Sequence, residues 1–520
     1  MGTSTDPVVV IGAGPVGLTA ALSLARRGLP VVVLERRLTR DLAGSRSICQ
    51  QRDVLDIWAS VGARAIADEG LTWTTARTYY RDAELFAWRF ADAGPLPPFV
   101  NLSQTRTEEI LDALVAESDL IEVRRGHDVI GLRQDAAGVT LRSASGEETR
   151  ASYVIACSGG RSETLRETLG VGFPGKTFED QFLICDLRFD MPGWEQERRF
   201  FFDPPWNPGR QVLIHPCPGS HYRIDWQVPP DYSLADDEAS GGLDRRIRQI
   251  IGDRPYEVVW KTVYRFHSRV ADRLRVGRVL LAGDAAHLLS PFGARGLNSG
   301  VPDADNAAWK IAFVARGWAP EDLLETYHQE RHAAALENLA VTTDTMRFLV
   351  PQNDEERDLR RAALDRAAAD PSATAAVDSG RLAEPYWYAD SPLTTPEPTR
   401  PPTGRPSKGA LQPPAPGVIV PDAPINHPHA TRLRELLRDG FTLIQAADTG
   451  DVTPETDLPL TTLHLRDLDP TGALAKALDV RPGEAWLVRP DAHLAAILPA
   501  AGPARVSAAL RRAVSAFSAP

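Results

Sequence analysis

Apolar runs and helical spacing alternate at the start of the chain. Val8 to Ile11 form a short apolar run, which predicts a buried parallel strand. Residues 15–27 place apolar side chains at helical spacing, and Gly28 is a typical helix stop. Val31 to Leu34 predict a second buried strand, which Glu35 closes. This strand–helix–strand order predicts an α/β domain built on a parallel sheet.

The pattern changes between residues 170 and 270, where polar and apolar side chains alternate and aromatic residues are frequent. Alternation with a period of two predicts half-buried strands, so we expect an antiparallel sheet inserted into the α/β domain. The expected strands cover residues 182–189, 198–202, 211–215, 222–228 and 257–266. A buried strand over 276–281 and a helical region over about 303–370 then follow.

Prolines are frequent over residues 392–424, which predicts an extended connector, because proline interrupts helices and central strands. Strand-like and helical segments alternate again beyond it. The expected division is an α/β domain in two parts with its helical region (1–168 and 276–390), an inserted sheet domain (169–275), a proline-rich linker (391–415) and a C-terminal domain (416–520).

Composition narrows the range of partners. The 520 residues carry a net charge of −11 without a long basic run, so we expect no nucleic-acid partner. No apolar stretch is long enough to cross a bilayer, and the first strand begins almost at once, so we expect neither a membrane span nor a signal peptide. The cysteines have no CxxC or metal-ligand spacing, which favours reduced thiols in a cytoplasmic protein without a metal site. They are Cys49, Cys157, Cys185 and Cys217.

Three glycines follow the first strand in the run Gly12-Ala13-Gly14-Pro15-Val16-Gly17. Between a strand and a helix, Gly12 allows the tight turn, Gly14 lets a pyrophosphate approach the backbone, and Gly17 lets the helix pack closely. The helix N-terminus offers free N–H groups to the phosphates. Glu35 lies 23 residues after Gly12, close to the spacing of about 20 for an acid that holds a ribose hydroxyl. This run predicts a dinucleotide site.

A second glycine-marked segment lies about 270 residues further on. It reads Gly283-Asp284-Ala285-Ala286-His287, and residues 291–300 follow as Pro-Phe-Gly-Ala-Arg-Gly-Leu-Asn-Ser-Gly. With both segments the chain resembles the class A flavoprotein aromatic hydroxylases, which have the para-hydroxybenzoate hydroxylase fold. Within that group it resembles the longer phenol and polyketide hydroxylases. The resemblance implies an α/β fold with a Rossmann-like FAD-binding domain, an inserted antiparallel β-sheet domain for the substrate, and a thioredoxin-like C-terminal domain.

The resemblance also implies which residues hold noncovalent FAD. Asp284 is expected on the ribitol or ribose, and a helix opened by residues 298–300 is expected at the pyrimidine edge, where its partial positive charge stabilises reduced flavin. Arg295 is a candidate to lie over the cofactor. The expected cofactor-binding residues are Gly12, Gly14, Pro15, Gly17, Glu35, Arg36, Arg46, Gln104, Gly159, Gly283, Asp284, Pro291, Gly296, Leu297 and Asn298.

Two departures from the family pattern stand out. Related chains usually carry Asp-Gly before Arg-Ser after the strand at 153–157, whereas this chain has Ser158-Gly159-Gly160-Arg161-Ser162. The missing acid leaves the choice between NADH and NADPH open. No cysteine follows Cys217, so the C-terminal domain has no thiol for disulfide exchange. We expect it to be structural or to form a subunit contact in a homo-oligomer.

The implied activity is a monooxygenase reaction. FAD is reduced by NADPH or NADH, and dioxygen reacts through a flavin C4a-hydroperoxide to hydroxylate a phenolic or polyketide aromatic substrate. A base should contact the phenol, and aromatic walls should exclude water. The candidates for the base are His215, Tyr222, Tyr264 and His267. The candidates for the substrate pocket are Trp206, His215, Tyr222, Trp226, Pro291, Phe292 and Gly293.

Two alternatives share these motifs. One is a Baeyer–Villiger or other ring-opening flavin oxygenase that acts on a quinone or an aromatic polyketide. The other is a flavin-binding protein without turnover, which the serine at Ser158 favours.

Overall fold

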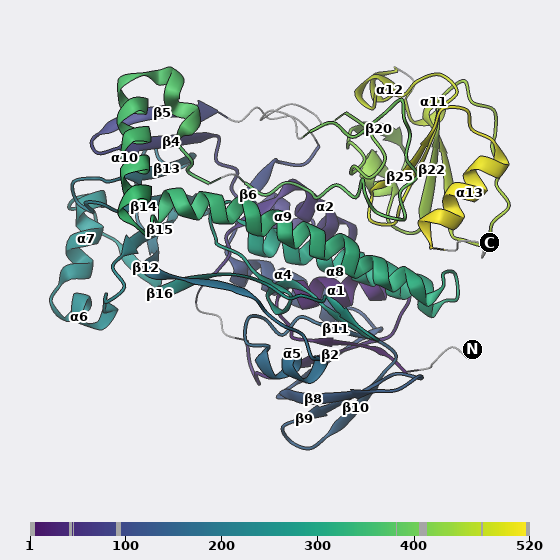
Figure 1. The fold of residues 1–520 in the computed structure, drawn as a ribbon, viewed down its shortest axis with the longest axis horizontal. Coiled ribbons are helices and arrows are strands. Elements are labelled where there is room, and N and C mark those ends of the chain that lie inside the picture. Colours follow the sequence, from purple (N-terminus) through teal and green to yellow (C-terminus); the bar gives the residue numbers. More distant parts are fainter. Residues whose placement is uncertain are drawn as a thin grey trace.

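The computed structural model describes residues 6–40, 44, 46–89, 95–380, 382–404, 413–469 and 472–515. Residues 405–412 of the expected proline-rich linker therefore lie outside the described residues. The chain forms a central α/β part, a large sheet beside it and a C-terminal part packed against the long helices (Figure 1).

The central sheet has six strands; five of them run parallel, and the edge strand β17 is antiparallel to its neighbour. β1 is buried throughout, as the apolar run predicts. The strand expected over 276–281 is instead a hairpin, because Gly277 adopts a positive φ of 59° and reverses the chain. In spatial order the strands are β17 (Arg275–Val276), β18 (Val279–Leu281), β11 (Val154–Ala156), β1 (Val8–Ile11), β2 (Val31–Glu35) and β7 (Ile121–Arg125).

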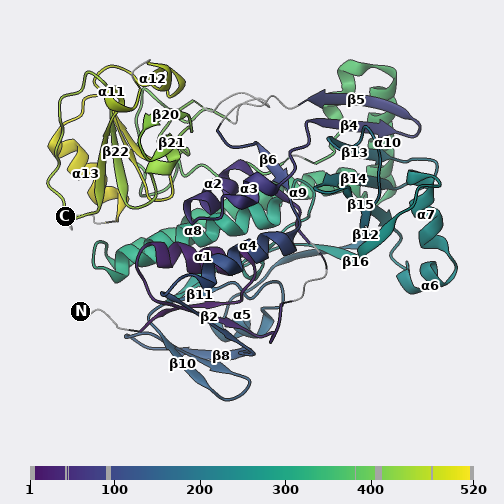
Figure 2. The same ribbon diagram turned by 180° about the vertical axis from the view of Figure 1, so that it is seen from behind.

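Helices cover one face of this sheet, and a small three-stranded sheet lies on the other side (Figures 1 and 2). The helix expected over 15–27 is α1, which ends one residue earlier and packs against α4 and α8. The helices are α1 (Pro15–Arg26), α4 (Gln104–Ala116), α8 (Arg295–Ala315), η2 (Glu321–Leu324) and α9 (Glu325–Leu349), with α5 (Glu163–Leu169) near the small sheet. The small sheet consists of β10 (Glu148–Ala151), β9 (Val139–Ser143) and β8 (Val129–Gln134).

The second large sheet has eight strands and contains all five strands expected between 170 and 270. Two further strands, β4 and β5, come from within the segment 1–168, so the sheet also draws on that segment. In spatial order the strands are β19 (His287–Leu288), β16 (Glu257–Val270), β12 (Gly175–Arg188), β15 (His221–Val228), β14 (Gln211–Cys217), β13 (Glu197–Phe202), β4 (Thr75–Tyr80) and β5 (Ala83–Arg89).

The two faces of the eight-stranded sheet have different neighbours. Because side chains alternate along a strand, Phe182, Leu213 and Phe266 face one side, where they pack with residues of α9 and α10. Leu183 and Ile224 face the other side and pack on α7. These covering elements are α6 (Leu234–Ala239), α7 (Gly242–Ile251), α10 (Asp354–Ala369) and η3 (Pro371–Ala376).

The C-terminal part contains a four-stranded sheet with the order β23-β22-β24-β25. β22 and β23 are parallel, and β24 is antiparallel to both β22 and β25. Its elements are β20 (Pro424–His427), β21 (Ala430–Arg432), η4 (Leu433–Leu436), β22 (Phe441–Gln445), β23 (Leu460–His464), α11 (Leu465–Leu468), α12 (Ala473–Ala477), β24 (Ala485–Val488), β25 (Leu494–Leu498) and α13 (Pro503–Ala513).

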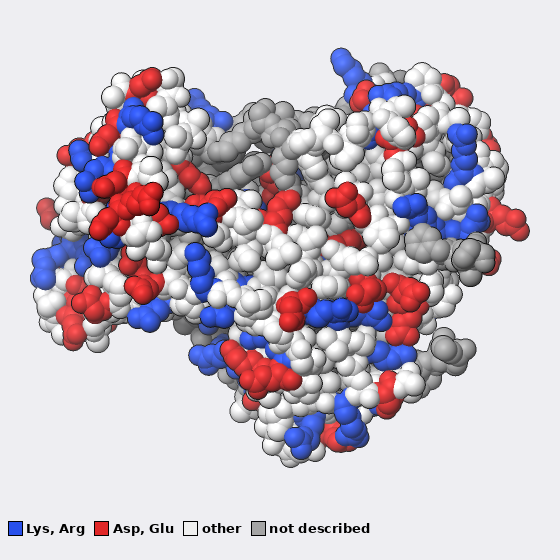
Figure 3. Space-filling view, in the orientation of Figure 1, with Lys and Arg blue, Asp and Glu red and all other residues white. Residues whose placement is uncertain are grey.

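Buried ion pairs join the C-terminal part to the helices that surround the central sheet. Arg438 lies 2.7 Å from Asp56 and 2.6 Å from Asp305, and Arg489 donates to both carboxylate oxygens of Glu330 at 2.6 and 2.9 Å. Asp56 belongs to α2 (Arg52–Ser60), which precedes α3 (Ala65–Glu69). Elsewhere, acidic and basic side chains are interspersed over the face seen in Figure 3.

Candidate active site

One cavity of about 1860 Å³ connects the central sheet with the eight-stranded sheet. A pocket for one small ligand occupies roughly 300–1,000 Å³, so this cavity has room for a large cofactor and a substrate together. Twelve of the fifteen residues expected to bind the cofactor line it, and Gly14 and Asp284 share its wall. The twelve are Gly12, Gly14, Pro15, Glu35, Arg36, Arg46, Gln104, Gly159, Asp284, Pro291, Gly296 and Leu297.

The first glycine run forms a turn at the carboxyl end of β1. Gly12 has a φ of 101°, and an added Cβ would lie 2.5 Å from the carbonyl oxygen of Cys157. At Gly14 an added Cβ would meet nothing within 4 Å, so this backbone faces open space in the cavity. At Gly17 an added Cβ would lie 1.9 Å from the carbonyl oxygen of Gly12. The turn therefore leaves a cradle above Gly14, beside the first N–H groups of α1, where Gly14 provides no side-chain cap.

Side chains from neighbouring elements hold this turn in place. Glu35 accepts a hydrogen bond from the N–H of Ala13 at 2.8 Å, so this carboxylate supports the turn as well as lining the cavity. Arg40 donates to the carbonyl oxygen of Ala13 at 2.8 Å and pairs with Glu108 and Asp112 of α4. The motif search missed Arg40, because an arginine between two elements carries no local signal.

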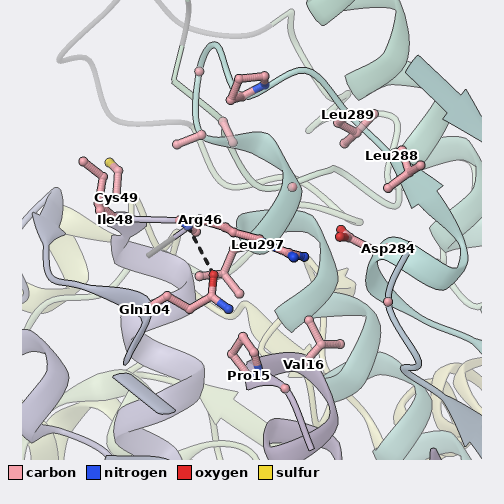
Figure 4. Close-up of a pocket in the computed structure, with 18 of the residues that line it drawn as sticks. Pro15, Val16, Arg46, Ile48, Cys49, Gln104, Asp284, Leu288, Leu289 and Leu297 are labelled. Carbon is pink, nitrogen blue, oxygen red and sulfur yellow. Dashed lines mark hydrogen bonds between the residues drawn. The ribbon is translucent and has the colours of Figure 1, made fainter. Parts of the chain in front are cut away.

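The second glycine segment closes over the first. Gly283 begins η1 (Gly283–Ala285) with a φ of 60°, and its N–H donates to Asp303 at 3.0 Å. His287 is buried and lies 2.8 Å from the same carboxylate, so it points away from the cavity. An added Cβ at Gly300 would lie 2.7 Å from Val16 of α1. This close packing of α8 on α1 brings the two segments together, and Figure 4 shows Pro15, Leu297 and Asp284 around the same hollow.

The N-terminus of α8 also faces the cavity. It begins at Arg295, and the preceding Ala294 adopts a left-handed φ of 55° and provides no side-chain cap. Gly296 and Leu297 line the cavity, and an added Cβ at Gly296 would meet nothing within 4 Å. A 21-residue helix therefore directs free N–H groups and a partial positive charge at this space.

The remaining positions of the second segment serve packing. The side chain of Asn298 accepts from the N–H of Gln51 at 2.9 Å and donates to the carbonyl oxygen of Cys49 at 2.9 Å. Asn298, Gly17 and Gly283 are absent from the cavity wall. Arg295 is buried and donates to Asn338 and Leu382, so the expectation that it lies over the cofactor is wrong. Helix α8 begins at Arg295, three residues before the start expected at residue 298.

Asp284 is the acid of the second segment that faces the cavity. Burial raises its pKa above the ordinary range, and the nearby His287 and Arg46 partly oppose this. Arg46 lies beside Gln104 on the opposite wall (Figure 4). Gln104 is fixed there, since its Oε1 accepts from the N–H of Ser47 at 3.2 Å and its Nε2 donates to Glu108 at 2.8 Å.

The turn after β11 carries Ser158 where related chains usually carry an acid. Ser158 lines the cavity, and its hydroxyl lies 2.7 Å from the hydroxyl of Ser162. The Ser162 hydroxyl donates to the carbonyl oxygen of Gly159 at 2.6 Å. Gly159 has a φ of 78° and faces the cavity. The turn keeps its glycine conformation while presenting a hydroxyl in place of a charge.

The aromatic candidates divide between the two faces of the eight-stranded sheet. His215, Tyr264 and His267 line the cavity, together with Pro291, Phe292 and Gly293. Trp206, Tyr222 and Trp226 do not, which corrects their assignment to the substrate pocket and that of Tyr222 as a base. Tyr222 and Trp226 belong to the core on the α7 face, and Trp206 packs against it. Strand alternation determines which of these side chains share a face of the sheet, but the sequence alone does not say which face meets the cavity.

Charged residues on the central strands of the eight-stranded sheet also line the cavity, and no motif in the sequence indicated them. Among them are Arg198, Arg223 and Asp225, which alternate with core residues on β13 and β15. Arg223 donates to both oxygens of Asp186 at 2.8 and 2.9 Å. Burial lowers the pKa of Arg198 to about 10. A polar residue in an alternating strand usually faces water, so their position required the strand register.

The described part of the chain meets neither the requirements of a membrane-spanning helix nor those of a metal site. Within it, no helix is both long and apolar enough to cross a membrane. No group of three or more His, Cys, Asp or Glu side chains in the described ranges is placed to hold a metal ion. The four cysteines are free thiols, and burial raises the pKa of Cys49 to about 12.

Comparison with known proteins agrees with this geometry. Residues 5–343 match the family model described as FAD binding domain. The chain is 35% identical to the rifampicin monooxygenase of Streptomyces venezuelae over 64% of this chain and 69% of the relative. It is 33% identical to the 3-(3-hydroxy-phenyl)propionate/3-hydroxycinnamic acid hydroxylase of Comamonas testosteroni over 64% of this chain and 57% of that relative. The crystal structure of the flavin-dependent monooxygenase PieE, in complex with FAD and substrate, has a similar fold, with a TM-score of 0.82, 24% identity and 98% of each chain covered.

Proposed function

Since the chain belongs to the FAD binding domain family and is an FAD-dependent aromatic hydroxylase, we propose that it uses NADH or NADPH to insert one oxygen atom of dioxygen into a phenolic or polyketide aromatic ring. One observation carries this proposal. A single cavity is bounded at one end by both glycine segments and at the other by an aromatic sheet face.

The cavity wall fits FAD in shape and in charge. The open backbone at Gly14 and the N-terminus of α1 suit a pyrophosphate. Glu35 has carboxylate oxygens for ribose hydroxyls, and Asp284 has them for the ribitol chain. The N-terminus of α8 would lie at the pyrimidine edge of the flavin. When bound and reduced by a nicotinamide donor, FAD supplies the chemistry that activates dioxygen.

The protein's own contribution is to orient the substrate and exclude water. Phe292 packs edge-on against Phe182 and Phe266, with ring centroids 5.4 and 5.9 Å apart. These rings form a wall next to Pro291 and Gly293, at the start of the loop that leads into α8. An apolar wall at this position keeps water away from the reacting oxygen and favours transfer to the ring.

We also propose functions for the parts of the chain. Segments 1–168 and 276–390 would hold FAD, segment 169–275 with β4 and β5 would hold the substrate, and 391–415 would link them to a thioredoxin-like domain at 416–520. The strand order β23-β22-β24-β25, with a parallel pair followed by two antiparallel strands, supports this last assignment. Its buried arginines favour a structural role.

The test begins with the absorption spectrum of the purified protein before and after addition of FAD. Small phenols, quinones and polyketide cores are then screened while NADH or NADPH oxidation and oxygen uptake are followed together. We expect an aromatic compound that stimulates both equally and gives a product heavier by one oxygen atom. A product in which the new oxygen atom lies in an ester or lactone and not in a hydroxyl group would favour the Baeyer–Villiger alternative. Flavin reduction that no aromatic compound stimulates would favour a non-catalytic flavin protein.

A further inference from the structure

The cavity face of the eight-stranded sheet carries a small polar group among its aromatic side chains. His215 on β14 is paired in register with Arg223 on β15, and Leu213 is paired with Asp225. Residues two apart on a strand share a face, so His215, Arg223 and Asp225 point to the same side. Diagonal cross-strand neighbours lie about 7–8 Å apart at their Cα atoms. His215 and Asp225 are therefore close enough to contact one small ring, and both line the cavity.

The charged neighbours of this group already have partners. Arg223 is held by Asp186 through two hydrogen bonds and also donates to the carbonyl oxygen of Arg46 at 3.2 Å. Arg198 donates to the carbonyl oxygen of Ser379 at 2.9 Å. In contrast, Oδ1 of Asp225 and Nδ1 of His215 have no hydrogen-bond partner among the described residues. These two atoms are themselves enclosed, and a buried polar atom without a partner is costly. Because both side chains also line the cavity, a polar ligand group that reaches them there can supply the missing partner.

The protonation states make this pair suitable for accepting a proton. Burial raises the pKa of Asp225 to about 7, with Asp186 raising it and Arg223 lowering it. Burial, together with Arg198 and Arg223, keeps the pKa of His215 well below its ordinary value, so this imidazole is neutral. Cys217 on β14 and Cys185 on β12 also lie close enough to Asp225 to feel its charge, and they remain thiols because burial raises the pKa of each to about 12. A carboxylate that titrates near neutral pH is well matched to a phenol.

We propose that Asp225 is the catalytic base for the hydroxyl group of the aromatic substrate and that His215 positions this hydroxyl, which deepens the proposed function and rests on it. The phenolic O–H donates to the Asp225 carboxylate. The O–H bond of the phenol breaks, a new O–H bond forms on the carboxyl, and the electron pair stays on the phenolate oxygen. The ring carbons ortho and para to that oxygen become more nucleophilic, as electrophilic oxygen transfer requires.

The test uses the FAD-loaded protein and 4-nitrophenol, whose phenolate absorbs in the visible range. Difference spectra are recorded across a pH series for the wild type, Asp225→Asn and Asp225→Glu. The matched control is Asp231→Asn, which changes an exposed aspartate three residues beyond β15. We expect the bound dye and Asp225 to titrate as a coupled pair in the wild type and the control, because the carboxylate opposes a second negative charge beside it. In Asp225→Asn the ionisation midpoint of the dye should therefore fall by about 1 pH unit or more, and Asp225→Glu should keep part of the wild-type midpoint.

A wild type that binds no 4-nitrophenol, or an Asp225→Asn variant with an unchanged ionisation midpoint, would overturn the proposal. His215→Gln should raise the dissociation constant of the dye while leaving its ionisation midpoint nearly unchanged. A changed midpoint with an unchanged dissociation constant would contradict the positioning role of His215. Flavin content and thermal unfolding show whether each variant is folded. Turnover is measured separately. If the wild type shows the Asp225-dependent change in dye ionisation but inserts no oxygen into any aromatic compound, the proposed function is refuted and the role of Asp225 as a base is not. If the wild type inserts oxygen with NAD(P)H oxidation matched to product but dye ionisation does not depend on Asp225, the role of Asp225 as a base is refuted and the proposed function is not.

Discussion

Replacing Gly17 by alanine tests the close approach of α1 to the turn at Gly12. An added Cβ would stand 1.9 Å from a carbonyl oxygen, whereas such contacts essentially never fall below 3.0 Å, so helix and turn must separate by about 1.1 Å. Overpacking costs about 1–3 kcal/mol, and we expect the upper end because a backbone oxygen cannot rotate away. Alanine returns about 1 kcal/mol through its helix propensity. The free energy of unfolding should fall by about 2 kcal/mol.

The matched control is Gly14→Ala, three residues earlier. The added methyl group would meet nothing within 4 Å, and Gly14 has an ordinary φ of −77°. This variant without FAD should unfold at the same urea concentration as the wild type, yet hold FAD much more weakly. Tryptophan fluorescence in urea measures stability, and the ratio of flavin to protein absorbance measures retention. A Gly17→Ala protein as stable as the wild type would refute the packing argument, and full FAD retention by Gly14→Ala would refute the phosphate cradle.

Three further outcomes follow from the same structure. Because burial raises the pKa of Asp284, its ionisation opposes folding once the pH exceeds the ordinary aspartate pKa of about 4. The FAD-free Asp284→Asn variant should therefore lose less stability than the wild type as the pH rises above about 4, while retaining less FAD, and identical pH–stability curves would contradict this. Arg489→Met should lower the free energy of unfolding by about 3–5 kcal/mol, since it takes a buried cation from both Glu330 and Asp491 and leaves Lys310 as the remaining cation at Glu330. The exposed Arg133→Met should have little effect in the same urea titration. Phe292→Ala should admit water to the cavity, so more hydrogen peroxide should form per NAD(P)H oxidised, and an unchanged ratio would count against the water-excluding wall.

Local patterns predicted the elements that carry the glycines. The strand at Val8–Ile11 and the helix after Gly14 were predictable because each depends on a few adjacent residues. The positive φ of Gly12 agrees with its predicted role in a tight turn, and the close contact at Gly17 agrees with its predicted role in helix packing. The roles of these residues toward FAD stay predictions.

The pairing of strands that are distant in the sequence could not be predicted from local patterns. The strands that contain Trp226 and His215 were predictable, but their inward face depends on which side α7 covers. Asn298 was expected to bind the cofactor because the family resemblance places it at the start of a helix that meets the flavin, and instead its side chain ties α8 to residues 49 and 51. Asp225 gave no signal at all, since its importance comes from neighbours on strands that are distant in sequence.

The salt-linked junction between the C-terminal part and α2, α8 and α9 constrains how such proteins can be recombined. Asp56, Asp305 and Glu330 are almost fully enclosed, and their counter-charges come from Arg432, Arg438 and Arg489. A shortened protein that ends before residue 416 would leave Asp56 without these cations, Asp305 with Arg27 alone and Glu330 with Lys310 alone. A chimaera of two related proteins should therefore take the acids of α2, α8 and α9 and the arginines of the C-terminal part from the same parent. The C-terminal part and the rest of the chain are then expected to evolve together as one unit.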